Sequence, residues 1–151
     1  MSLGGGGGES QLQELAQQLE ALDEQREALE TEIEALRARQ AAIDEAIEAI
    51  GELETGATVQ VPLGGGAYTR ATIEDADEVV VELGGGYAAE RDQAGAASTL
   101  ESKKETIDGR VDEVQSEIAD LESETEQLEE RAQQLQAQQL QQAQQQRQQD
   151  E

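Results

Sequence analysis

The sequence predicts an α+β chain: a long antiparallel two-helix coiled coil with two β-hairpins inserted between its helices. Three observations predict it, namely a leucine-rich heptad run early in the chain, a second heptad run late in the chain, and a valine-rich segment with two triple-glycine stretches between them. Apolar residues spaced alternately by three and four form one stripe along a helix, and two such stripes pack together as a coiled coil.

The first coiled-coil helix is predicted over residues 10–50, after a glycine-rich N-terminus (1–9) that should be flexible. Ser10 and Gln13 fit a capping box at its start. Gly51 is expected to end the helix in a left-handed conformation, with Gly56 completing the exit. Its heptad series is Leu12, Leu15, Leu19, Leu22, Arg26, Leu29, Ile33, Leu36, Gln40, Ile43, Ile47 and Ile50.

Residues 51–97 change in character, because β-branched residues and glycine replace the leucine-rich pattern. This composition, cut by turn signals, is typical of short strands joined in hairpins. Pro62 cannot donate to a strand ladder, so it suits a strand end or an edge. The predicted strands are 57–62, 67–73, 78–83 and 87–91, and the turns lie at 64–66, 74–77 and 84–86.

The second coiled-coil helix is predicted over residues 98–142, followed by a frayed, glutamine-rich tail at 143–151. Its start is either Asp92 or Ser98; the Ser98-Thr99-Leu100-Glu101 capping box favours the later start, and Gly95 weakens the earlier one. A compact insert brings its two ends together, so the second helix should fold back along the first. This pairing places Gln40 near residues 109–111.

Charge restricts the partners of the chain. It has 35 acidic and 10 basic residues, a formal net charge of -25, which argues against binding to nucleic acid or to an anionic membrane. The acidity, together with only two lysines, is typical of a halophilic cytoplasm, where molar salt shortens the screening length to about 3 Å. The alternative is an acidic protein of an ordinary cell, which would remain folded in low salt.

Catalytic and metal-binding chemistry is not expected. The chain has no histidine and no cysteine, so it lacks an imidazole base, a thiol nucleophile and the usual zinc ligands. The triple-glycine stretches lack the Lys and Ser/Thr of a phosphate loop, and the segment starting at Asp75 lacks the glycine and glutamate of a calcium loop. We therefore predict no enzymatic activity and no cofactor. Without a secretory signal or an apolar span, a cytoplasmic location is expected.

The free tips of the predicted coiled coil are the candidate binding surface. The heptad leucines there have two readings: they are either covered by the partner helix or exposed enough for non-directional apolar contact with another chain. We favour the second reading for the residues nearest the chain ends. These candidate client-binding residues are Leu12, Leu15, Leu19, Leu128, Leu135 and Leu140.

Two glycine-rich turns add a specific resemblance. The segments Val61-Pro62-Leu63-Gly64-Gly65-Gly66-Ala67-Tyr68 and Val79-Val80-Val81-Glu82-Leu83-Gly84-Gly85-Gly86-Tyr87 lie inside a coiled coil at the spacing seen in the alpha class of the archaeal prefoldin family. The chain resembles that class over about residues 10 to 140. Two hairpins, rather than one, separate the alpha class from the beta class.

The resemblance implies an ATP-independent chaperone subunit. It implies a hetero-hexamer of two alpha and four beta subunits, with the hairpins assembled into β-barrels and the coiled-coil tips holding unfolded polypeptides for transfer to a group II chaperonin. A coiled-coil scaffold that binds a defined native partner is the alternative. The expected oligomerisation residues are Val59, Val61, Leu63, Tyr68, Ile73, Val79, Val81, Leu83 and Tyr87.

Overall fold

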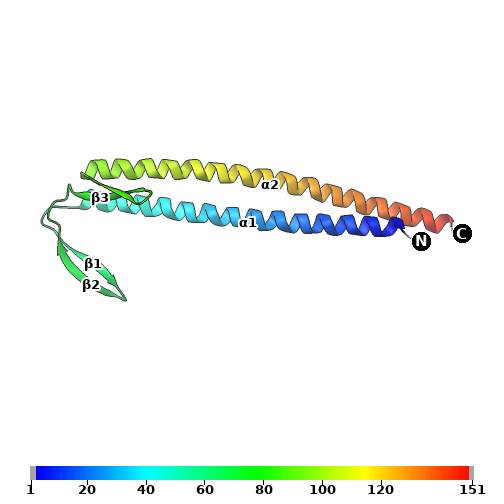
Figure 1. Cartoon of the computed structure of the whole chain (residues 1–151), viewed down its shortest axis with the longest axis horizontal. Helices are drawn as coiled ribbons and strands as arrows, with labels where there is room; N and C mark the ends of the chain where they lie inside the picture. Colours follow the sequence, from blue (N-terminus) through cyan, green and yellow to red (C-terminus); the bar gives the residue numbers. More distant parts are fainter. Residues whose placement is uncertain (1–2, 150–151) are drawn as a thin grey trace. The chain divides into compact units, whose positions relative to one another are not determined.

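The computed structural model of the chain, described here for residues 3–149, contains two long helices with two β-hairpins between them in sequence (Figure 1). The elements are α1 (Leu3–Glu52), β1 (Thr58–Gly64), β2 (Ala67–Thr72), β3 (Val79–Gly84), β4 (Tyr87–Arg91) and α2 (Gln93–Gln149). The chain divides into two compact units. The terminal unit holds the described residues up to Glu34 and from Asp112 onward; the hairpin unit is Ala35–Val111.

In the terminal unit, α1 and α2 run antiparallel. The backbone of Gly8 lies against the side chain of Gln139, Leu15 and Leu135 line one groove, and Leu29 and Leu121 line another. Residue numbers rise along one helix as they fall along the other, which is the pairing that the two heptad series predict. Leu15 and Val114 are buried in this unit.

In the hairpin unit, polar side chains link the two helices. Gln40 Nε2 donates to the carbonyl of Lys104 at 3.3 Å and to a carboxylate oxygen of Asp108. Gln93 Nε2 donates to the carbonyls of Ile50 at 2.8 Å and Leu53 at 2.9 Å, at the C-terminal end of α1. The Ile50 carbonyl also accepts from the N–H of Leu53 at 3.3 Å.

In this unit the contacts lie slightly earlier in α2 than predicted, because Gln40 bonds Lys104 and Asp108, just before the expected residues 109–111, and Gln93, rather than Leu100, contacts Ile50. The start of α2 also differs from the favoured prediction. Asp92 is its N-cap: the Asp92 carboxylate accepts from the N–H of Gly95 at 2.6 Å, and the Asp92 carbonyl accepts from Ala96 at 2.8 Å. The helix therefore begins before Ser98, at the earlier of the two predicted starts.

The other helix ends also differ from the expectation. α1 begins at Leu3, so Ser10 lies inside the helix and is not its cap. Each helical glycine costs about 1 kcal/mol relative to alanine, but extending an existing helix adds one hydrogen bond for each residue fixed. α1 continues through Gly51 to Glu52, and the left-handed glycine at the exit is Gly56, with φ of 87°.

The glutamine-rich tail is helical as far as Gln149, where fraying was expected from residue 143. Glutamine is a good helix former, so composition alone does not end the helix. Residues 1–2 of the predicted flexible N-terminus and residues 150–151 of the predicted tail lie outside the described residues. Among the helices that are described, none is long and apolar enough to cross a membrane.

Both hairpins have the same construction. β1 pairs antiparallel with β2, and β3 pairs antiparallel with β4. The last residue of β1 or β3 and the two turn residues that follow it are glycines with positive φ: 98°, 61° and 82° at Gly64–Gly66, and 97°, 62° and 82° at Gly84–Gly86. A two-residue hairpin turn with positive φ at both central positions strongly favours glycine. Hydrogen bonds from Gly56 to Ile73 and from Ile73 to Ala57 extend the first ladder.

Candidate functional site

The hairpins expose most of the large apolar side chains that the chain leaves uncovered. Among the predicted oligomerisation residues, Ile73 and Val79 are half-buried and Val81 is only 4% exposed. The other six are exposed: Val59, Val61, Leu63, Tyr68, Leu83 and Tyr87. Exposed apolar side chains gathered on short two-stranded sheets are typical of a surface that another chain covers.

A β-bulge places a leucine at the same point of each hairpin. The strand register shifts between Pro62 and Gly64 in the first hairpin and between Glu82 and Gly84 in the second. The residues inside these shifts, Leu63 and Leu83, are 67% and 47% exposed. A bulge re-aims a side chain away from the regular pleat. Each hairpin therefore presents a leucine beside its glycine turn.

The run Val79–Val81 has one covered and one open face. Neighbouring residues of a strand point to opposite faces, and Val81 is buried whereas Val80 is 64% exposed. The oligomerisation residues predicted from the sequence include Val79 and Val81 but not Val80. The three consecutive valines could have indicated that Val80 belongs to the interface, because a strand that is apolar on both faces has to be covered on both faces.

The candidate tip residues differ in exposure. Leu15 is buried and Leu140 is 66% exposed. Leu12, Leu19, Leu128 and Leu135 are half-buried. Four residues after Leu135, the next heptad position that faces α1 is Gln139, and its side chain lies against Gly8. Leu140 is the following residue, so it points away from α1 and stays exposed. That these residues bind clients stays a prediction.

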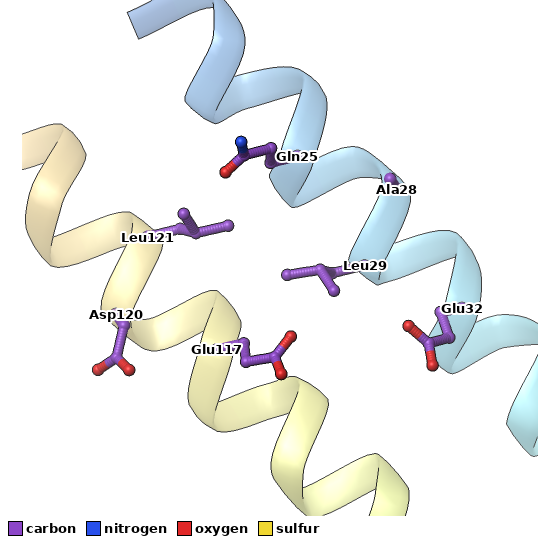
Figure 2. Close-up of a pocket in the computed structure, with 7 residues that line it drawn as sticks. All are labelled: Gln25, Ala28, Leu29, Glu32, Glu117, Asp120 and Leu121. Atoms are coloured by element: carbon purple, nitrogen blue, oxygen red, sulfur yellow. The ribbon is translucent and has the colours of Figure 1, made fainter. Parts of the chain in front are cut away.

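Two grooves in the terminal unit expose part of the leucine seam. The larger, of about 500 Å³, is lined by Gln25, Ala28, Leu29 and Glu32 from α1 and by Glu117, Asp120 and Leu121 from α2. Leu29 and Leu121 point toward each other across it, with Gln25 on one side of the pair and Glu117 and Glu32 on the other (Figure 2). The second, of about 390 Å³, contains Leu15 and Leu135 with Arg131 at its edge. Apolar surface is therefore accessible along this unit.

An ion pair crosses between the helices in the hairpin unit. Lys104 Nζ donates to Asp44 Oδ1 at 2.8 Å, and this hydrogen bond is the main cause that raises the pKa of Lys104; the charges of Asp44, Asp108 and Glu101 add to it. A lysine with a raised pKa contributes stability below its unfolded-state pKa. That contribution is lost as the pH rises through the folded-state pKa.

We expect Asp44→Asn to lower the pKa of Lys104, because it removes the carboxylate that accepts the Nζ proton. The pKa is measured by a pH titration of the lysine side-chain NMR signals, with Glu45→Asn as the control at an exposed neighbouring position. An unchanged Lys104 titration in Asp44→Asn would contradict the cross-helix pair.

Known proteins are similar to this chain in sequence and in fold. A family model described as "Prefoldin subunit" matches residues 22–138. The chain is 71% identical to a prefoldin subunit alpha of Haloarcula marismortui over 98 residues, 65% of this chain and 64% of that protein. It is 68% identical to a prefoldin subunit alpha of Halobacterium salinarum over 108 residues, 72% of this chain and 70% of that protein.

A solved structure shows the same architecture. The cryo-EM structure of filamentous PFD from Methanocaldococcus jannaschii has a TM-score of 0.68 and 28% identity, and the match covers 75% of this chain and 96% of that one. The segment matched in the Haloarcula relative is just under two thirds of that protein's length. The family model covers most of the chain, and the relatives from halophilic archaea agree with its acidic composition. The chain therefore belongs to the prefoldin family.

Proposed function

We propose that the chain is an alpha-type subunit of an ATP-independent chaperone that holds unfolded polypeptides and transfers them to a group II chaperonin. Membership of the prefoldin family supports this function. The structural observation that carries the proposal is that the hairpins and the coiled-coil ends each have an apolar surface of their own. Exposed residues on both hairpins are available for assembly, and Leu140 with the half-buried leucines near the chain ends is available for clients.

The assembly in this proposal is a hetero-hexamer of two such chains and four single-hairpin beta subunits. A two-stranded hairpin leaves unpaired backbone groups at both edges, and strands from neighbouring subunits satisfy them when the hairpins join into β-barrels. The fold shared with filamentous PFD supports assembly through this architecture. The proposed location is the cytoplasm.

Client binding in this proposal needs no precise side-chain geometry. Unfolded chains share exposed apolar groups, and apolar contact is non-directional. Leu140 and the half-buried leucines near the chain ends offer such contact. A scaffold that clamps one native partner is the alternative. It would show binding to that partner and no general effect on aggregation.

Deleting residues 1–19 and 130–151 tests the client-binding tips. The variant should keep its native mass with a beta subunit, because the hairpins are intact, but should lose most of its ability to suppress aggregation of a denatured client. Native mass spectrometry and light scattering, without ATP, measure the two effects.

A point variant removes the risk that deletion unfolds the remaining coiled coil. Leu140→Ser should weaken suppression, whereas Gln138→Ser, at an exposed position two residues away, should not. Unchanged suppression in both the deletion and Leu140→Ser would reject the tip model.

A further inference from the structure

The last part of α2, residues 131–149, differs in charge from the rest of that helix. Residues 100–130 contain 12 acidic side chains, whereas residues 131–149 contain none and include 12 glutamines. Glutamate and glutamine have similar helix propensities, so helix formation does not require the change. Solvation does not require it either, because most exposed positions between 100 and 130 are acidic. Absence of charge is instead typical of a surface that another chain covers.

Leu140 is the exposed leucine of this segment, and its helical neighbours form a small patch around it. Residues three and four positions apart lie side by side on a helix. The four neighbours at these spacings are all exposed: Ala137 and Ala143 at three, Gln136 and Gln144 at four. We call these five residues the Leu140 patch. Its small alanine side chains let the backbone of another chain approach the helix closely, within reach of the two longer glutamines.

Glutamine amides bond peptide carbonyls elsewhere in this chain. Gln93 Nε2 donates to two of them, the carbonyls of Ile50 at 2.8 Å and Leu53 at 2.9 Å. A glutamine side chain has two N–H donors and one carbonyl acceptor, so it can bond either group of a peptide unit. The exposed amides of Gln136 and Gln144 offer the same chemistry to a second chain.

An unfolded polypeptide presents the complementary groups. When Leu140 covers an apolar side chain of such a polypeptide, the peptide groups beside that side chain also lose water. This loss costs free energy unless the peptide groups find new hydrogen-bond partners. Gln136 and Gln144 are separated by about 12 Å along the helix, which is the length of roughly three to four residues of extended chain. The two amides can therefore serve peptide groups on both sides of one apolar side chain.

We propose that the Leu140 patch binds the backbone of an unfolded client. Leu140 contacts an apolar side chain of the client, and the amides of Gln136 and Gln144 donate to its peptide carbonyls. The inference rests on the chaperone function proposed above and names what the patch recognises, an extended chain with free peptide groups. A folded protein is a poor ligand, because nearly all of its backbone groups are already paired.

Gln136→Ala with Gln144→Ala tests the amides, because alanine keeps the helix and the charge but removes the donors. The complex with a beta subunit is titrated against a fluorescently labelled, uncharged peptide of glycine, serine and leucine, and anisotropy gives the affinity in molar potassium chloride. The variant should bind at least about fivefold more weakly, as expected for the loss of two hydrogen bonds. Apolar contact alone predicts equal or tighter binding, because alanine is less polar than glutamine.

Gln138→Ala with Gln142→Ala is the matched control, since both residues are exposed and lie on the opposite side of α2 from Leu140. It should keep the original affinity. A second probe is the same peptide with backbone esters in place of amides, because an ester oxygen is a weaker acceptor and the side chains are unchanged. The ester peptide should bind the original complex more weakly than the amide peptide. This difference should shrink in Gln136→Ala with Gln144→Ala.

The outcomes separate this inference from the proposed function. Unchanged or tighter peptide binding by Gln136→Ala with Gln144→Ala would overturn the inference, and weaker binding by Leu140→Ser would then leave the chaperone proposal standing on apolar contact alone. A loss of peptide binding that comes with a loss of native mass would overturn the inference in favour of a contact between subunits. An original complex that neither binds the peptide nor suppresses aggregation of a denatured client would contradict the proposed function itself.

Discussion

Replacing Val61, Leu63, Leu83 and Tyr87 with serine is expected to dissociate the proposed assembly while the helices stay folded. All four side chains are exposed in the isolated chain, so their loss removes little packing within it. Burial of a large apolar side chain contributes about 1.5–3 kcal/mol. The four side chains are 40%, 67%, 47% and 76% exposed, so their losses amount to roughly 3–7 kcal/mol per subunit, which is about two to five orders of magnitude in an association constant.

The measurement is the native mass in molar potassium chloride with a beta subunit, together with helical circular dichroism. Leu140→Ser is a matched control, because Leu140 and Leu63 are 66% and 67% exposed but only Leu63 lies on a hairpin. The control should keep the full mass. A fourfold serine variant with the wild-type mass would show that the hairpin side chains do not hold the subunits together.

Transfer from molar salt to about 0.1 M salt is expected to unfold the chain. Glu32 apart, every described aspartate and glutamate side chain is exposed, and the net charge is -25. The screening length increases from about 3 Å at 1 M to about 10 Å at 0.1 M, so carboxylates on successive helical turns then repel one another. Loss of the helical circular dichroism signal should accompany dilution of the salt and reverse when salt is restored.

Neutralising part of the charge should reduce the salt requirement. Glu20→Gln, Glu24→Gln, Glu122→Gln and Glu126→Gln replace exposed carboxylates of the terminal unit with a side chain of similar shape and helix propensity. The variant should reach half of its helical signal at a lower salt concentration than the original chain. Full helicity of the original chain at 0.1 M salt would contradict a halophilic adaptation.

Much of the fold follows from the sequence because its main signals are periodic. Two heptad series predict two helices and their antiparallel pairing, and the triple glycines predict the turns at positions where φ is positive. Helix ends were less predictable. Ser98 and Asp92 are both good N-caps, and the structure uses Asp92. The neighbouring Gln93 then bonds the carbonyls of Ile50 and Leu53, which are far away in sequence, so local sequence patterns do not reveal this contact.

Exposure at the candidate surfaces was the hardest property to predict. Heptad spacing identifies Leu15 as a residue of the contact between the two helices. It does not predict that Leu15 is buried, because that depends on the position of Leu135 of α2, which lines the same groove. In the run Val79–Val81, strand alternation separates two faces without indicating which one the chain covers itself. The structure resolves this by burying Val81 and leaving Val80 open.

The distance between Gln18 and Arg131 tests the antiparallel pairing most directly. Both residues line the same groove of the terminal unit, and the absence of cysteine allows a single pair of spin labels to be introduced at these positions. Paired helices are about 8–10 Å apart at their axes, so double electron–electron resonance should give roughly 15–25 Å between the labels. Labelled chains are diluted with unlabelled ones to suppress signals between subunits.

Helices that diverge or form one continuous rod would give a very different result. Gln18 lies about 51 Å before the end of α1 and Arg131 about 57 Å after the start of α2, so in one continuous rod the labels would lie on the order of 100 Å apart. A single narrow distribution in the short range is the predicted result. A distribution centred beyond 60 Å would contradict a chain that folds back on itself and would leave the proposed client-binding tips without a structural basis.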